Sequence, residues 1–345
     1  MQRVQSPAME RFHALALQQF HGSALERAQR LVMKPVHGLV LMLVAFLLSG
    51  CQIDLPLKDL KSRYGSGASR YLPMDGIEVH WRDEGPTDAP VLLLLHGTAS
   101  SLHTWDGWVA ELTPRWRVVR LDLPGFGLTG PHPSDDYSTA AMIDFLDRFV
   151  KAAGLQRFAI AGNSLGGQYA WRFALRHPER VSALILIDAA GYPMRLEGPG
   201  TLGLRLARMP VISDLLRLAP VEGFTRSGLL AVYGDRSRVG DELITRHAEL
   251  MLRPGNRAAL SARARSVDPH DESWRQLPRI TAPTLVMWGE RDSWITPEFG
   301  RRFTGDIPGA QLLIYPDLGH VPMEEDPART ARDAAAFLRS KGVSR

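Results

Sequence analysis

A serine stands between two glycines at the point where an apolar stretch meets a helical pattern. Residues 162–166 read Gly-Asn-Ser-Leu-Gly and follow the apolar residues 158–161. Glycines at both ends of a Gly-x-Ser-x-Gly turn let the chain reverse sharply, which forces the serine into a strained and exposed conformation. A serine hydroxyl also needs a neighbouring base before it can attack a carbonyl. We therefore assign Ser164 as a candidate nucleophile for acyl transfer.

The base should be a histidine at another strand end. Of the eleven histidines, His320 fits best, because it follows Gly319 directly after the last strand-like run, residues 311–315. An imidazole there can take the serine proton and return it to the leaving group. A capping or buried structural histidine is the alternative interpretation of this position.

The third group should be an acid that orients the imidazole. Asp292 follows the apolar residues 284–287, on a polar loop one strand before His320. We expect a carboxylate there to reach the imidazole without being desolvated on both sides. Asp188, at the end of an earlier apolar run, is the competing acid, and Glu290 is a weaker one.

A tetrahedral intermediate also needs hydrogen-bond donors aimed at its oxyanion. One is the backbone N–H of Leu165, just past the serine, where the positive end of the following helix adds to the effect. The second is predicted in the loop after residues 91–95, where His96-Gly97 places the N–H of Thr98 near the top of the sheet. His96 itself is expected to have a different role.

The composition is globular and restricts the partners. The 345 residues are 45% hydrophobic and 23% charged, with one cysteine, so an intramolecular disulfide and a cysteine-rich metal site are excluded. Residues 52–345 carry 36 basic and 35 acidic side chains, which gives no electrostatic case for nucleic-acid binding. We predict a small-molecule substrate and neither a metal nor an organic cofactor. The oligomeric state stays open.

The elements that must position these residues alternate along the chain. Short apolar runs, most of them continuous as in strands covered on both faces, lie at residues 77–81, 91–95, 118–121, 158–161, 183–187, 284–287 and 311–315. Helical patterns such as 140–153 and 168–177 separate them. The order predicts an α/β fold: a mostly parallel central sheet flanked by helices on both faces. Leucines at helix-like spacing predict a helical cap inserted at about 191–275.

The N-terminus has the composition of a targeting segment. Residues 36–48 are apolar and uncharged but shorter than the roughly 20 residues that span a bilayer, as in a signal peptide. Leu48-Ser49-Gly50-Cys51 then resembles the lipobox of bacterial lipoproteins, which implies lipidation of Cys51. The next residue is not Asp, which in such lipoproteins implies the outer membrane. An uncleaved anchor with an unmodified cysteine is the alternative.

This gives three parts: a signal segment at 1–50, with Met33 as a possible true start, a polar linker at 51–70, and a domain at 71–340. The N-terminal anchor makes the membrane a predicted partner. The expected location is the bacterial cell envelope, in a lipid-anchored, periplasm-facing form.

The chemistry-bearing motifs occur in a recognisable order. They are His96-Gly97, residues 122–127 reading Asp-Leu-Pro-Gly-Phe-Gly, the serine turn, residues 289–292 reading Gly-Glu-Arg-Asp, and Gly319-His320. Over about residues 71–340 the chain resembles the α/β-hydrolase fold superfamily of the capped type. The resemblance implies an acyl-enzyme hydrolase, with carboxylic esters that have a hydrophobic part as the main expected substrates.

The sequence of the serine turn, Gly-Asn-Ser-Leu-Gly-Gly, is similar to that of the carbon–carbon bond hydrolases that cleave ring-fission products. In those enzymes Met usually replaces Leu165, and a Trp tends to follow the Gly-His, where this chain has Val321. A carbon–carbon hydrolase is therefore the alternative function. A catalytically inactive, tethered binding protein is another, and acyltransferase or haloperoxidase activity by the same three side chains stays open.

Overall fold

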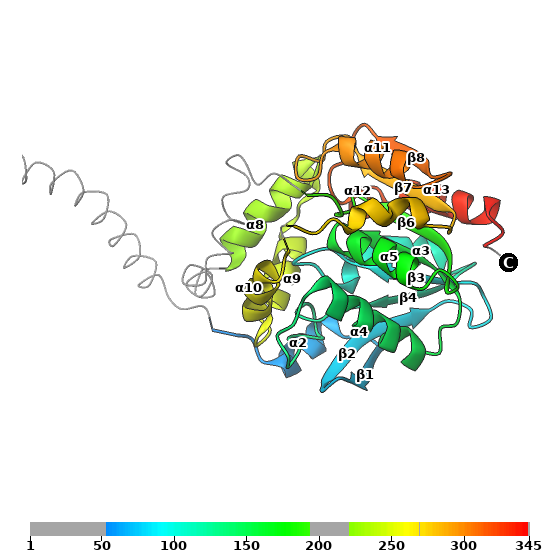
Figure 1. The fold of residues 1–345 in the computed structure, drawn as a ribbon. Coiled ribbons are helices and arrows are strands. Elements are labelled where there is room, and N and C mark those ends of the chain that lie inside the picture. The colour runs from blue at the N-terminus through cyan, green and yellow to red at the C-terminus, as the bar shows by residue number, and fades with distance from the viewer. Residues whose placement is uncertain (1–52, 194–220, 269, 344–345) are drawn as a thin grey trace, which may run out of the picture. The chain divides into compact units, whose positions relative to one another are not determined.

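An eight-stranded sheet lies at the centre of the computed structural model, which describes residues 53–193, 221–268 and 270–343 (Figure 1). The strands are β1 (Ser69–Met74), β2 (Ile77–Glu84), β3 (Val91–Leu95), β4 (Arg117–Leu121), β5 (Phe158–Asn163), β6 (Val181–Ile187), β7 (Thr284–Gly289) and β8 (Gln311–Tyr315). Their order is β1-β2-β4-β3-β5-β6-β7-β8, and β2 is antiparallel to β1 and β4, whereas every other pair is parallel. The predicted mostly parallel sheet is confirmed.

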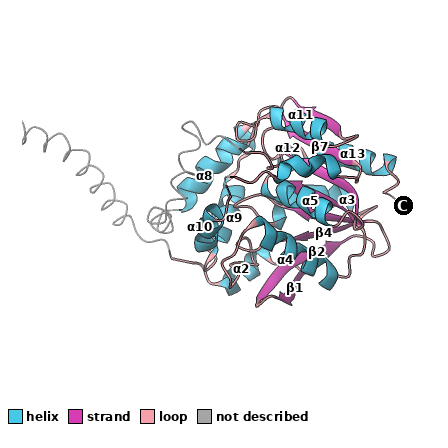
Figure 2. Ribbon diagram, viewed as in Figure 1, coloured by secondary structure: helices cyan, strands magenta, loops and turns pink. Residues whose placement is uncertain are grey.

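Successive residues of the strands face opposite layers of helices (Figure 2). In β3, Leu93 and Leu95 belong to the core cluster that contains side chains of α4 (Thr139–Ala152), α5 (Leu165–Arg176) and α11 (Pro297–Asp306). Leu92 and Leu94 belong to a second cluster with α3 (Asp106–Leu112) and α13 (Pro327–Ser340). Burial on both faces is the reason why these strands are continuous apolar runs rather than alternating ones.

The flanking helices begin at residues that can satisfy their free N–H groups. The Ser138 side chain accepts a hydrogen bond from the N–H of Ala141 at the start of α4, and Asp326 does the same for Arg329 at the start of α13. Helix α13 is joined to α3 by a hydrogen bond from Trp108 Nε1 to Thr330 Oγ1, 2.9 Å long. In the same layer Trp116 Nε1 donates to Val343 O at 3.1 Å, so packing and buried polar contacts together hold this layer.

Between β6 and β7 the described residues contain helices and turns. They include α8 (Val221–Val232), α9 (Asp241–Met251), α10 (Asn256–Arg265) and the 3-10 segment η4 (Ser273–Arg279). Figure 1 shows α8, α9 and α10 gathered at one end of the sheet. The predicted helical cap at 191–275 therefore has its described part in these helices, while residues 194–220 lie outside the described residues.

The segment predicted as a linker differs from that expectation. Within residues 51–70, helix α2 (Leu57–Tyr64) forms and β1 begins. The N–H of Leu55 donates to Leu252 O at 2.8 Å, and the Tyr64 hydroxyl donates to Glu249 Oε2 at 2.7 Å, so this segment is attached to α9 and the residue after it. Leu57, Leu60 and Tyr64 have helical spacing and pack in one cluster, but the helix has only eight residues in a polar stretch, so its pattern is too short to predict it.

The predicted signal segment, Cys51 included, lies outside the described residues. Among residues 53–193, 221–268 and 270–343, no helix has the length and apolar character required to cross a bilayer. The lipidation of Cys51 remains a prediction from sequence.

Candidate active site

Ser164 occupies the turn between β5 and α5. Its backbone has φ +52° and ψ −116°, a left-handed conformation that is costly for a residue with a Cβ atom. The N–H of Ser164 donates to Ile187 O at 3.0 Å, which ties the turn to the end of β6. This is the strained strand-to-helix turn that the Gly-x-Ser-x-Gly spacing predicts.

Neighbouring backbone atoms lie so close to the two flanking glycines that a side chain would not fit at either position. A Cβ atom on Gly162 would collide with the backbone of Gly166, and one on Gly166 would collide with the carbonyl group of Leu95. The missing side chains let α5 start directly against β5 and β3. The N–H groups of the first helical turn have no partner within the helix, and they lie beside Ser164.

His320 and Asp292 are joined by a short hydrogen bond between Nδ1 and Oδ2, 2.6 Å long. Both side chains are buried, and Asp292 is fully enclosed. This corrects the expectation of a solvated acid: the carboxylate is desolvated, and the N–H groups of Trp294 (2.8 Å) and Ile295 (3.0 Å) compensate through its other oxygen. Such fixed donors can hold a buried carboxylate in its ionised form.

The residue next to the serine connects it to the histidine. Asn163 Nδ2 donates to His320 O at 2.9 Å and to Ile187 O at 3.2 Å. The N–H of His320 donates in turn to Val232 O, 2.7 Å away at the end of α8. The His320 backbone is therefore held from two sides beside the serine turn. Within the described residues the Ser164 hydroxyl makes no hydrogen bond, so it is free to rotate.

The two competing acids have different positions. Asp188 follows β6 and is fully buried, and its carboxyl group, that of Asp292 and the His320 ring each place one atom within 4.8 Å of the others. Burial, and next the charge of Asp292, raise the pKa of Asp188 well above its ordinary value. Glu290 is exposed and lies 3.6 Å from Arg301, so it has no part in this cluster.

Three groups this close could in principle share a metal ion. A zinc ion would hold each ligand atom at about 2.0–2.2 Å and would thereby keep the ligand atoms about 3 Å or more apart. His320 Nδ1 and Asp292 Oδ2 are 2.6 Å apart, the distance of a charge-assisted hydrogen bond. We therefore interpret the cluster as a proton-sharing site.

The loop after β3 carries the predicted second oxyanion donor. His96 Nδ1 donates to Gly97 O at 2.7 Å, and His96 Nε2 accepts from the N–H of Leu123 at 3.0 Å. An accepting Nε2 requires a neutral ring, and burial lowers the pKa of His96 to about 4. The next residues are the exposed Thr98 and then Ala99, which has φ +56°. His96 thus holds the loop that carries Thr98, and the role of the Thr98 N–H as an oxyanion donor stays a prediction.

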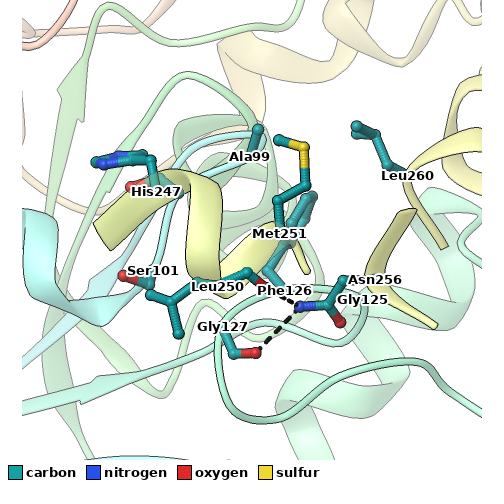
Figure 3. A pocket seen from close by; sticks show the side chains of 11 residues that line it. Ala99, Ser101, Gly125, Phe126, Gly127, His247, Leu250, Met251, Asn256 and Leu260 are labelled. Atoms are coloured by element: carbon teal, nitrogen blue, oxygen red, sulfur yellow. Dashed lines mark hydrogen bonds between the residues drawn. The ribbon is translucent and has the colours of Figure 1, made fainter. Parts of the chain in front are cut away.

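A small pocket lies between this loop and the cap (Figure 3). Its walls are Ala99–Ser101, the turn Gly125–Gly127, and side chains of α9 and α10. Figure 3 shows Asn256 bridging two walls, because Nδ2 donates to Gly127 O (3.1 Å) and to Leu250 O (2.8 Å). The lining is mostly apolar, with His247 as its titratable group; burial lowers the pKa of His247.

An aromatic side chain stands near the histidine. Trp294 is 55% exposed, and its ring is stacked toward that of His320 with centroids 6.4 Å apart. It follows Asp292 by two residues, so the loop that supplies the acid also supplies an apolar surface next to the imidazole.

Sequence reasoning missed two of the residues that build this site. Asn163 lies inside the serine motif, but its bonding to His320 depends on a contact across 157 residues. Glu325 is the last residue of the four-residue helix α12 (Pro322–Glu325). Its side chain accepts hydrogen bonds from the N–H groups of Gly319 at 2.6 Å and Gly234 at 2.9 Å. No sequence signal marks Glu325, because its side chain accepts from backbone groups, those of Gly319, Gly234 and Asp235.

Known proteins place this architecture in a family. Residues 90–327 match the family model described as alpha/beta hydrolase fold. A 2-hydroxy-6-oxononadienedioate/2-hydroxy-6-oxononatrienedioate hydrolase of Burkholderia vietnamiensis is 30% identical over 293 residues, covering 79% of this chain and 96% of that protein.

Two solved structures are similar along most of their length. The meta-cleavage product hydrolase of Pseudomonas fluorescens is 25% identical, with a TM-score of 0.69, covering 79% of this chain and 97% of that one. A membrane phospholipase A, described as a bacterial virulence factor, is 28% identical, with a TM-score of 0.65, covering 90% of this chain and 99% of that one. By its fold and by the family model that spans most of its length, the chain belongs to the α/β-hydrolase fold family.

Proposed function

We propose that the protein is a serine hydrolase that forms an acyl-enzyme at Ser164. The observation that carries the proposal is the buried 2.6 Å hydrogen bond between His320 and Asp292 at the strand edge where Ser164 sits in a strained turn. An imidazole held in this way presents Nε2 to the serine hydroxyl as a general base. The oxyanion would be bound by the N–H groups of Leu165 and Thr98.

Each proton has a destination in this mechanism. Ser164 Oγ adds to the substrate carbonyl while His320 Nε2 takes its proton. The bond to the leaving group then breaks, and His320 returns the proton to that group. Water then adds to the acyl-enzyme carbonyl while His320 Nε2 takes one of its protons. The bond to Ser164 Oγ breaks, His320 returns the proton to that oxygen, and the carboxylic acid is released. Asp292 stays ionised throughout and stabilises the imidazolium.

For the substrate we favour cleavage of a carbon–carbon bond next to a ketone, as in ring-fission products. In that reaction the leaving electron pair and the returned proton go to carbon. Support comes from the hydrolase of Burkholderia vietnamiensis and from the meta-cleavage product hydrolase, both of which match this chain over 79% of its length. The ester preference expected from sequence has less support among named relatives.

Ester hydrolysis is the second candidate, and one observation favours it. The membrane phospholipase A matches 90% of this chain, more than the two carbon–carbon hydrolases described above. The exposed Trp294 beside His320 would suit an apolar chain in either reaction.

A fluorophosphonate probe tests the shared mechanism without knowledge of the substrate. We expect labelling of the wild-type protein at one serine, and no labelling of Ser164→Ala. Absence of labelling in the wild type would favour the remaining function class, an inactive binding protein.

The substrate class requires a direct comparison. Purified protein is assayed with two sets of substrates. Cleavage of 2-hydroxy-6-oxo-dienoates is followed by the loss of the dienoate absorbance, and cleavage of short-chain and long-chain nitrophenyl esters by the release of nitrophenol. We expect the larger kcat/KM on the dienoates, with both activities absent in Ser164→Ala. A higher kcat/KM on esters would reverse the preference. Added alcohol acceptors would reveal acyl transfer as a second product, and a haloperoxidase would be recognised by halogenation with peroxide.

The cellular location is a separate proposal that rests on residues 36–51 alone. We propose that Cys51 is lipidated and anchors the enzyme in the cell envelope, facing the periplasm. Labelling with a palmitate analogue should depend on Cys51 and disappear in Cys51→Ala. Equal incorporation, or none in the wild type, would exclude a lipid anchor at this position.

A further inference from the structure

Asp188 has a place in the site that the proposed mechanism does not use. It follows β6 with φ +43°, another left-handed conformation in a residue with a side chain. Its own N–H donates to Met287 O at 3.1 Å, and its Oδ1 accepts the N–H of Gly289 at 3.0 Å. Both contacts are with β7, the strand that leads to Asp292. The carboxyl group is therefore fixed in direction.

The second oxygen of this carboxyl group has no ordinary donor. Asp188 Oδ2 is buried, and no N–H or hydroxyl group of the described residues reaches it. One atom each of the Asp188 carboxyl group, the Asp292 carboxylate and the His320 ring lie within 4.8 Å of one another. A buried oxygen without a donor is costly if it is charged, and inexpensive if it carries a proton that can be donated to a neighbouring acceptor.

The surrounding charges are mostly negative. Asp292 and His320 face Asp188 from their loops, Glu325 lies on α12, and Tyr315 ends β8. The Tyr315 hydroxyl donates to Asp333, so it is not available to Asp188. Glu325 already accepts three backbone N–H groups. Within the described residues neither Asp188 nor Asp292 has a Lys or Arg partner.

Two enclosed carboxyl groups with one histidine between them cannot both ionise at little cost. Asp292 has the fixed donors: two backbone N–H groups and the His320 ring. Asp188 has a single backbone donor. The negative charge therefore belongs on Asp292 and the proton on Asp188.

We propose that Asp188 is a positioning residue whose carboxyl group stays protonated and donates a hydrogen bond to Asp292, so that the pair carries one negative charge, facing His320. This inference rests on the proposed function of the site. The raised pKa of Asp188, caused first by burial and then by Asp292, agrees with it. The O–H of Asp188 would orient the Asp292 carboxylate and keep its basicity low enough for the proton to stay on His320.

The amide Asp188→Asn is the decisive variant, because it copies a neutral acid in shape and can still donate to Asp292. We expect it to react with the fluorophosphonate at Ser164 within about threefold of the wild-type rate and with the same pH midpoint. Asp188→Ala removes the donor, so it should react about tenfold more slowly, with a higher pH midpoint because Asp292 becomes more basic. Thermal melts of both variants establish that they are folded.

Two results would overturn the inference. If Asp188 were ionised, Asp188→Asn would remove a negative charge and lower the pH midpoint by about one unit. If Asp188 were the acid that holds His320, the same variant would lose about four orders of magnitude in rate.

A second measurement does not depend on activity. The infrared spectrum of the wild-type protein in D₂O at neutral pH should contain the carbonyl band of a protonated carboxylic acid, and Asp188→Asn should lack it. Equal spectra would refute the inference. A wild-type protein that the probe does not label would instead refute the proposed function, and the infrared comparison would still decide the state of Asp188.

Discussion

In the part of the chain that the structure describes, two buried histidine–aspartate pairs have nearly the same geometry. His320 and Asp292 are 2.6 Å apart at the end of the sheet where Ser164 lies, and His80 and Asp122 are 2.7 Å apart between β2 and the loop after β4. In both pairs Nδ1 faces the carboxylate. Distance and burial alone would therefore assign the same chemistry to both.

The pairs differ in what surrounds them. His80 Nε2 is already bonded to Ser69 Oγ at 2.8 Å, which completes a second serine–histidine–aspartate chain. That serine oxygen also accepts from the N–H of Ser66 at 3.0 Å and from Arg82 Nε at 3.3 Å, so its lone pairs are occupied. Ser164, in contrast, has a hydroxyl without a partner in the described residues and a strained backbone.

The aspartates differ in the same way. Asp122 accepts the N–H groups of Leu102 and Leu128, each at 2.7 Å, from two loops that it holds together. Among the described N–H groups, Asp292 has as donors the His320 ring and the N–H groups of Trp294 and Ile295 in its own loop. We infer that the chain at Ser69 is structural, because fixed donors use the lone pairs of Ser69 Oγ, whereas the Ser164 hydroxyl stays available to a base and a substrate.

The largest expected effect distinguishes the two carboxylates by rate. Asp292→Asn should lower turnover by about four orders of magnitude, because the imidazole loses the partner that fixes its tautomer, as in the serine-protease case. Asp122→Asn should retain turnover within about tenfold in the folded fraction. Steady-state kinetics on any cleaved substrate measure both. Comparable losses in the two variants would mean that the second pair also serves the chemistry.

The next effect is one of stability. His80→Leu leaves the buried Asp122 carboxylate without its side-chain hydrogen-bond partner, so we expect the free energy of unfolding to fall by about 3 kcal/mol. Denaturant unfolding, followed by tryptophan fluorescence, measures it. His177→Leu, a change at a half-buried surface histidine, is the matched control and should cost less than about 1 kcal/mol. Similar midpoints for the two variants would contradict the structural role of His80.

The pH dependence of stability should have opposite signs at Asp122 and Asp188. Burial raises the pKa of Asp122, but the charge and hydrogen bond of His80 outweigh it and hold the pKa well below its ordinary value. The stability from Asp122 is thus complete above about pH 4 and is lost as the pH falls further. Asp188, with its raised pKa, costs stability as the pH rises above about 4.

Unfolding of the two asparagine variants at several pH values checks this. Asp122→Asn should be less stable than the wild type at neutral pH, and this difference in the free energy of unfolding should disappear as the pH falls below about 4. Asp188→Asn should become more stable than the wild type as the pH rises above about 4, by up to about 1.4 kcal/mol per pH unit. Parallel curves for wild type and Asp188→Asn would show that this carboxyl group ionises normally.

The smallest effect concerns the second serine. Ser69→Ala removes one hydroxyl from a satisfied network, so it should cost about 1 kcal/mol of stability and leave fluorophosphonate labelling unchanged. Mass spectrometry of labelled peptides locates the probe. Labelling at Ser69 in the Ser164→Ala variant would show that the saturated chain is reactive after all.

Much of the fold was predictable because strands that are buried on both faces consist of continuous apolar residues. All seven predicted strands are present, and their ends differ from the apolar runs by at most three residues. β1 was not predicted, because none of its six residues is fully buried and Pro73 interrupts its short apolar part. Helix α2 was not predicted because it has only eight residues in a polar stretch.

The site was partly predictable. The residue types of Ser164, His320 and Asp292, and their order at strand ends, follow from the chain alone. The substrate class does not, because ester and carbon–carbon cleavage use the same three side chains and differ in the surfaces around them. The state of Asp188 could not be predicted either, since it depends on which donors reach each oxygen.

The sequence by itself determined the chemistry that is available: a serine on a turn that only glycines allow, and a histidine and several acids after apolar strands. The tertiary structure alone decided which acid pairs with His320 and that this acid is desolvated. It also decided that the hydrogen-bonding groups of Ser69, in the similar Ser69–His80–Asp122 network, are all used. The physical reason is that pairing and charge depend on distances and donors across the sheet edge. These distances depend on contacts between separate parts of the chain, as in the contact from Asn163 to His320 across 157 residues.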